Sequence, residues 1–204
     1  PYQKAGYNWF NFLQQFKFGG CLADDMGLGK TIQTLALLQS QKELLTEAID
    51  VKTSLLVLPT SLIYNWEKEA RKFAPELQIH LHTGNNRVKD PQLLSKYDLI
   101  ITTYGISRID EELLSQFYFN YIILDESQNI KNPTSKSFKA IKSLISKHKL
   151  ALSGTPVENS VSDLWAQMHF ANPGLLGSYS YFQKEFVQPI EKKKDEEKAR
   201  KLQT

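Results

Sequence analysis

The segment that most constrains this chain is a glycine-containing turn between an apolar run and a helical pattern. It reads Ala23-Asp24-Asp25-Met26-Gly27-Leu28-Gly29-Lys30-Thr31. Residues 18–23 predict a short buried strand, and residues 31–38 carry apolar side chains at helical spacing. In such a turn, glycine amides, the start of a helix and a lysine can converge on one phosphate group. The sequence therefore predicts a phosphate-binding loop.

The residues of this loop have separate predicted roles. Gly27 and Gly29 let backbone N–H groups turn inward, Lys30 supplies positive charge to the outer phosphates, and Thr31 holds Mg²⁺ by its hydroxyl. The strict pattern GxxxxGK[ST] asks for glycine where this chain has Asp24, so a structural turn with an exposed lysine remains an alternative. The predicted nucleotide contacts in this loop are Asp25, Met26, Gly27, Leu28, Gly29, Lys30 and Thr31.

A second informative segment lies much later in the chain, where apolar residues run into two carboxylates. Tyr121-Ile122-Ile123-Leu124 is followed by Asp125 and Glu126. Parallel sheets bind ligands at the carboxyl ends of their strands, so these carboxylates are expected near the phosphate loop. Asp125 is the expected Mg²⁺ partner, and Glu126 would polarise the water that attacks the γ-phosphate. Alone, the pair is an ordinary strand exit; with the loop, it predicts nucleotide hydrolysis with Lys30, Asp125 and Glu126 as catalytic residues.

Short apolar runs alternate with amphipathic helical patterns along the chain. The strand candidates after the loop are residues 55–58, 78–82, 99–103, 121–124 and 149–152. This alternation predicts an α/β fold in which helices cover both faces of a mainly parallel sheet. With 204 residues and 41% hydrophobic content, the chain can form one large domain. We expect Ile145, Trp165 and Met168 to face the core from helices.

Composition excludes several other classes of protein. The net charge of +3 gives little general support for nucleic-acid binding, so local patches must supply it. The single cysteine, Cys21, rules out an internal disulfide framework and is expected in the core. No apolar run is long enough for a membrane span, and no signal peptide opens the chain. His80 and His82 share a predicted strand face without a third nearby ligand, so a metal site there is not favoured.

The order of these motifs resembles the first RecA-like lobe of the SNF2 branch of superfamily 2 helicase-like ATPases. The resemblance runs nearly end to end. The matching segments are Pro1-Tyr2-Gln3 with Asn8-Trp9 (Q-type motif), Asp24 to Thr31 (motif I), Leu58-Pro59 with Asn65-Trp66 (motif Ia), Thr102-Thr103-Tyr104 (motif Ic), Asp125-Glu126-Ser127-Gln128 (motif II), and Ser153-Gly154-Thr155-Pro156 (motif III). An aspartate at position 24 is usual in this family, and the Ser127-Gln128 ending resembles bacterial members.

The resemblance implies ATP and Mg²⁺ as cofactors and movement along double-stranded DNA without strand separation. Gln3 would read adenine, while Ser153, Gly154 and Thr155 would couple hydrolysis to movement. The DNA backbone contacts implied are Pro59, Thr60, Ser61, Arg87, Thr103, Tyr104 and Lys131. The protein remodelled would be a DNA-bound complex such as RNA polymerase, in the bacterial cytoplasm at the nucleoid, or in the nucleus of a eukaryote.

The resemblance also divides the chain. Residues 1–190 would form the ATP-binding lobe, and the charged residues 191–204 would lead to a second RecA-like lobe. That lobe would supply an arginine to the ATP site, so this chain alone is expected to hydrolyse ATP poorly. Two other functions remain open, an RNA helicase lobe and a nucleotide-gated DNA clamp with little hydrolysis.

Overall fold

The computed structural model describes residues 2–24, 27–44, 51–154, 161–192 and 194–203. Its centre is a sheet of six strands in the order β1-β6-β5-β2-β4-β3, and every neighbouring pair is parallel. The strands are β1 (Gly20–Leu22), β2 (Ser54–Leu58), β3 (Ile79–Leu81), β4 (Leu99–Thr103), β5 (Tyr118–Leu124) and β6 (Ile145–Leu152). The predicted parallel sheet is confirmed.

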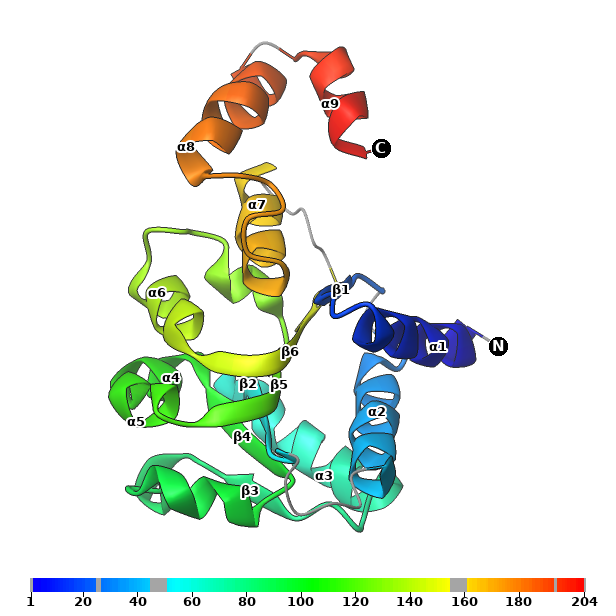
Figure 1. The fold of residues 1–204 in the computed structure, drawn as a ribbon, viewed down its shortest axis with the longest axis vertical. Coiled ribbons are helices and arrows are strands. Elements are labelled where there is room, and N and C mark those ends of the chain that lie inside the picture. Colours follow the sequence, from blue (N-terminus) through cyan, green and yellow to red (C-terminus); the bar gives the residue numbers. More distant parts are fainter. Residues whose placement is uncertain (1, 25–26, 45–50, 155–160, 193, 204) are drawn as a thin grey trace.

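Helices cover both faces of this sheet (Figure 1). One face carries α1 (Tyr2–Gln15), α2 (Lys30–Leu44) and α3 (Ile63–Phe73). The other carries α4 (Tyr104–Ile109), α5 (Glu111–Ser115), α6 (Lys136–Ser143) and α7 (Val161–Ala171). Short 3₁₀ turns connect these elements: η1 (Thr60–Leu62), η2 (Gly84–Asn86), η3 (Pro91–Lys96) and η4 (Ser127–Ile130).

The alternation of side chains along β2 shows why its sequence is apolar at successive positions. Leu55 and Val57 lie in the core beneath α4 to α7, whereas Leu56 and Leu58 lie in the core beneath α1 to α3. Successive strand residues point to opposite faces, so a strand covered on both sides needs apolar residues throughout. The expected three-layer arrangement is confirmed.

The C-terminal elements stand beyond α7, away from the sheet (Figure 1). They are α8 (Tyr179–Phe182), the π-helix η5 (Gln183–Lys192) and α9 (Glu196–Gln203). The division expected at residue 190 falls inside η5, and α9 contacts η5 through Lys198 Nζ and Glu185 Oε2, 2.7 Å apart. The separation into lobe and exit segment stays a prediction. No helix in the described ranges is long and apolar enough to cross a membrane.

Two of the positions expected in the core, Ile145 and Met168, are not buried. Ile145 is 48% exposed, because it begins β6 instead of extending a helix. Trp165 is buried as expected, but Met168 is only half-buried, and Gln167 is fully buried beside it. Cys21 is half-buried and packs against the core. Burial raises the pKa of its thiol to about 11, so it stays protonated.

Candidate nucleotide-binding site

The two motifs that are far apart in the sequence meet at one cavity of about 320 Å³. It lies at the carboxyl ends of β1 and β5, where a parallel sheet places its ligands. The side chains and loop residues that line it are Gly27, Gly29, Lys30, Thr31, Ile32, Leu62, Asn65, Trp66, Glu69, Asp125 and Glu126. The predicted phosphate loop and the predicted catalytic carboxylates therefore face the same space.

The loop has the backbone conformation that its glycines allow. Gly27 and Gly29 have φ angles of 83° and 84°, in the left-handed region that other residues avoid. Helix α2 then begins at Lys30, so its first N–H groups border the cavity. The Lys30 ammonium donates a hydrogen bond of 2.6 Å to the backbone oxygen of Asp24, which holds the lysine beside the loop.

Gln3, near the start of α1, lies directly beside this loop although the two are separated in the sequence. A Cβ atom added at Gly29 would come within 2.6 Å of Gln3 Nε2. A side chain at position 29 would therefore displace the Gln3 amide, in addition to straining the backbone. The structure brings the exposed amide of Gln3 to the edge of the predicted phosphate site, where an adenine contact is geometrically reasonable.

The Asp125 carboxylate is held by two hydrogen bonds within the protein. The Trp66 indole N–H donates to Asp125 Oδ2 at 2.6 Å, and the backbone N–H of Glu126 donates to Oδ1 at 2.9 Å. Burial raises the pKa of the Asp125 carboxyl, while the Trp66 hydrogen bond and the Lys30 charge oppose that rise. A buried carboxylate of this kind gains stability from a cation beside it, so the donor chemistry fits Mg²⁺.

Glu126 adopts a strained backbone conformation at the end of β5. Its φ of 48° is unusual for a residue with a side chain, and such strain is concentrated at functional sites. Gln128 Nε2 donates to Glu126 Oε2 at 2.6 Å, and Ser153 Oγ donates to Gln128 Oε1 at 3.1 Å. A chain of hydrogen bonds thus connects the expected coupling residue Ser153 to the expected catalytic carboxylate.

The profile of the family described as "SNF2-related domain" matches residues 2–204 of this sequence. The chain belongs to this family. A protein of Bacillus subtilis named "Putative ATP-dependent helicase/translocase YwqA" is 46% identical to this SNF2-related domain, over 100% of this chain and 22% of its own length. The "TATA-binding protein-associated factor mot1" of Schizosaccharomyces pombe is 40% identical, over 98% of this chain and 11% of its own length. The expected similarity to bacterial members is confirmed.

Solved structures give the same assignment. The "Sulfolobus solfataricus SWI2/SNF2 ATPase core in complex with dsDNA" matches with a TM-score of 0.85 and 47% identity, over 94% of this chain and 39% of that chain. The RecA-like fold expected from the motif order is confirmed by this match. This SNF2-related domain spans only between 11% and 22% of the length of the two curated relatives named above.

The residues expected to contact DNA divide into two groups in this SNF2-related domain. Thr60, Ser61 and Lys131 are exposed, Pro59 is half-buried, and all four follow the carboxyl ends of β2 and β5. Arg87 is partly exposed, and its Nη1 lies 2.9 Å from Asp110 Oδ1. These five positions remain predicted DNA contacts.

Thr103 and Tyr104 need a correction. Thr103 is 7% exposed, and its Oγ1 accepts a hydrogen bond of 3.1 Å from the Ile106 N–H, which caps α4. Tyr104 is 8% exposed, and its hydroxyl donates to the Asp125 backbone oxygen at 2.8 Å. Both side chains are occupied inside the protein, so neither has the surface position that a DNA contact requires.

Two supporting residues were missed by sequence reasoning because they act through a partner that is distant in the chain. Trp66 and Tyr104 hold Asp125 from its side chain and its backbone. Their places in the motif Ia-like and motif Ic-like segments were the available signal. Asp25, Met26 and Thr155, which were expected to bind nucleotide or couple hydrolysis, lie outside the described residues. Ser153 follows β6 directly, and Gly154 comes next.

Of the two histidines, His82 hydrogen-bonds within the protein, whereas His80 stacks on Tyr97. Val88 N–H donates to His82 Nδ1 at 3.1 Å, so His82 Nε2 carries the proton and donates to Asp110 Oδ2 at 2.8 Å. Burial has the largest effect on the pKa of His82 and lowers it, which favours the neutral form of the imidazole. His82 therefore anchors the loop that displays Arg87.

Proposed function

We propose that this chain is the ATP-binding lobe of a DNA-dependent ATPase that translocates on double-stranded DNA and remodels protein–DNA complexes. The observation that carries the proposal is the convergence of Lys30, Asp125 and Glu126 on one cavity of about 320 Å³. The Bacillus subtilis relative is named for ATP-dependent helicase or translocase activity, and the archaeal ATPase core was solved with double-stranded DNA. Both names support the proposed class of reaction.

Each residue of the cavity has a proposed role. Lys30 and the N–H groups at the start of α2 bind the β- and γ-phosphates. Thr31 and Asp125 hold Mg²⁺, which when bound neutralises charge on the phosphate oxygens. Trp66 and the Glu126 N–H orient Asp125 for this role. Glu126 accepts a proton from the attacking water, and Gln3 pairs with the adenine edge.

Ser153 and Gln128 are proposed to report the state of the site to the rest of the protein. The hydrogen bonds from Ser153 to Gln128 and from Gln128 to Glu126 change when Glu126 engages a water. Because Ser153 follows the end of β6, this change would pass to the residues that come next in the chain. Gly154 and Thr155 belong to the proposed coupling segment.

In this proposal, the duplex DNA and a second lobe complete the working site. Thr60, Ser61 and Lys131 present polar or cationic groups beside the nucleotide edge of the sheet, where they would contact phosphates of the duplex. A second RecA-like lobe of the parent chain would close over the same edge and supply an arginine. The target would be a DNA-bound protein complex such as RNA polymerase, in the cytoplasm of a bacterium or the nucleus of a eukaryote.

The test is ATP hydrolysis by this chain and by the chain extended through its second lobe, each with and without duplex DNA, single strands or RNA. The extended protein should be stimulated by duplex DNA, and Lys30→Ala should abolish that stimulation. The shorter chain should bind nucleotide and turn over on the order of 10³-fold more slowly or worse, as expected for a missing arginine. Stimulation by RNA in preference to duplex would contradict the translocase proposal, as would ATP binding without turnover in the extended protein.

A further inference from the structure

One edge of β6 has no strand beside it for much of its length. Pairing with β5 begins at Ile145, whereas β1 pairs only with Leu150 to Leu152. Within the described ranges, residues 145–149 of β6 therefore have a strand neighbour on the β5 side alone. An unpaired strand edge presents backbone N–H and C=O groups that can accept another strand.

The direction of these backbone groups follows from the pairing further along. Ser153 N–H donates to Leu22 O at 3.1 Å, on the β1 side. Backbone groups alternate sides along a strand inside a parallel sheet, so those of Lys149 and Lys147 point to the same side as those of Ser153. Both a donor and an acceptor of Lys147 therefore face the open edge.

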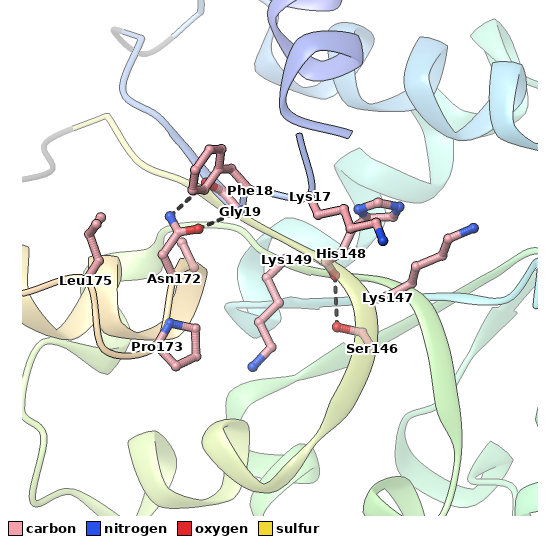
Figure 2. A pocket seen from close by; sticks show the side chains of 11 residues that line it. Lys17, Phe18, Gly19, Ser146, Lys147, His148, Lys149, Asn172, Pro173 and Leu175 are labelled. Carbon is pink, nitrogen blue, oxygen red and sulfur yellow. Dashed lines mark hydrogen bonds between the residues drawn. The ribbon is translucent and has the colours of Figure 1, made fainter. Parts of the chain in front are cut away.

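A cavity of about 520 Å³ lies against this edge (Figure 2). Its other walls are the turn of residues 17–19 and the end of α7 with the residues that follow. Asn172 fixes the two walls together, because its side-chain amide accepts from Gly19 N and donates to Gly19 O, both at 2.9 Å. A Cβ atom at Gly19 would come within 2.1 Å of Ala171 O, so the backbones are in close contact. The cavity is thus built by tertiary contacts.

The cavity is positively charged. Lys17, Lys147 and Lys149 line it, and none of its lining residues is Asp or Glu. Figure 2 shows Lys17 and Lys147 near His148 and the side chain of Lys149 pointing away from them. The Lys149 ammonium lies 5.3 Å from the centre of the Phe170 ring. Burial, and to a lesser extent the charge of Lys142 outside this cavity, lower the pKa of Lys149. With three lysines and no carboxylate in its lining, the cavity would attract a negatively charged occupant.

We propose that this cavity binds an acidic protein segment in extended conformation, which adds as a strand along residues 145–149 of β6. Such β-augmentation draws affinity from main-chain hydrogen bonds and specificity from side chains. A lone phosphate could pair with the lysines but could not use the carbonyl groups of the edge, so a peptide fits the whole surface better. The site lies at the amino ends of β1 and β6, opposite the nucleotide cavity, and it is independent of the proposed ATPase function.

The direct test uses a fluorescent hexapeptide of alternating glutamate and valine, with binding to this chain followed by fluorescence anisotropy. We expect saturable binding that Lys17→Glu weakens by about tenfold or more, because an attractive charge becomes repulsive. Lys139→Glu is the matched control, since Lys139 is exposed on α6 outside the cavity lining, and it should have little effect. Equal loss in both variants would show attraction to general positive charge and overturn the proposal.

A second comparison tests strand addition without altering the protein. The same peptide with N-methyl groups on alternate amides keeps its charge but loses main-chain donors, and it should bind about tenfold more weakly. Lys147→Pro should have a similar effect by removing the edge N–H, with circular dichroism to verify the fold. Absence of binding, or equal binding by the methylated peptide, would overturn the proposal. Displacement by inorganic phosphate or a DNA duplex at matched charge, with no effect of methylation, would identify a phosphate site instead.

Discussion

The contact between Trp66 and Asp125 offers the sharpest test of how this site is built. Replacing Trp66 with phenylalanine removes the indole N–H that lies 2.6 Å from Asp125 Oδ2. Trp66 is 1% exposed and Asp125 is 7% exposed, so water cannot easily replace the lost donor. Of the two donors described above, the carboxylate would keep only the Glu126 N–H. We expect lower stability and weaker Mg²⁺–ATP binding.

The magnitude follows from the charge and burial of the pair. A hydrogen bond to a charged group contributes about 1.5–3 kcal/mol, and the smaller ring removes on the order of 1 kcal/mol of packing. Trp165→Phe is the matched control, because Trp165 is 4% exposed and its N–H donates to the neutral Gly177 O at 3.3 Å. That weaker bond contributes only about 0.5–1.5 kcal/mol. The Trp66 variant should therefore be less stable than the control by about 1–2 kcal/mol.

Urea unfolding followed by circular dichroism measures the stability difference without relying on tryptophan fluorescence. Calorimetric titration with Mg²⁺–ATP measures binding, where about 1.4 kcal/mol of lost interaction corresponds to tenfold weaker affinity. Trp165→Phe should leave this affinity within about twofold. If the two variants lose the same stability and bind Mg²⁺–ATP equally well, Trp66 acts only by packing and our reasoning about Asp125 is wrong.

The remaining predictions concern the loop and the pH dependence of stability. Gly29→Ala should weaken nucleotide binding about fivefold more than Gly27→Ala. Both glycines have positive φ, but only Gly29 lies against Gln3. Equal losses of nucleotide affinity in calorimetric titrations would refute the argument from this contact. Burial and, to a lesser extent, Lys147 lower the pKa of His148 to about 4 from 6.5. Because the unfolded chain takes up the His148 proton first, the free energy of unfolding should fall by up to about 3 kcal/mol between pH 6.5 and pH 4. His148→Phe keeps a ring against Tyr121 and should flatten this part of the stability–pH profile. His82 and His169, whose pKa values are also lowered, account for any remaining slope. An unchanged slope would show that His148 is not the group responsible.

Much of the fold was predictable because local pattern and tertiary environment agree. The run at residues 99–103 was predicted as a strand and is β4 with the same bounds. The apolar character of β2 arises from burial on both faces, which sequence reasoning read correctly. Ile145 was misplaced because the start of β6 is fixed by its pairing with Tyr118 of β5, a partner that no local pattern reveals.

The candidate site shows the same division. The loop glycines and the carboxylates at a strand end were recognisable, because phosphate binding and metal binding demand particular residue types at particular local positions. The exposed polar residues Thr60 and Ser61 were also placed correctly at the edge of the sheet. Thr103 and Tyr104 were not, because hydroxyl groups can serve equally in capping, in buried hydrogen bonds or on a DNA-facing surface.

The sequence by itself determined the family of this protein and its proposed chemistry: a predicted phosphate loop, two carboxylates after an apolar strand, and a motif order that assigns it to the SNF2 family. These features are local, since a few adjacent residues suffice to create them. The tertiary structure decided which groups support that chemistry. Trp66 reaches Asp125, Gln3 packs on Gly29, and β1 begins its pairing with β6 only at Leu150. Such contacts depend on the packing of distant segments, because the free energy of burying apolar surface fixes their positions without leaving a local signature in the chain.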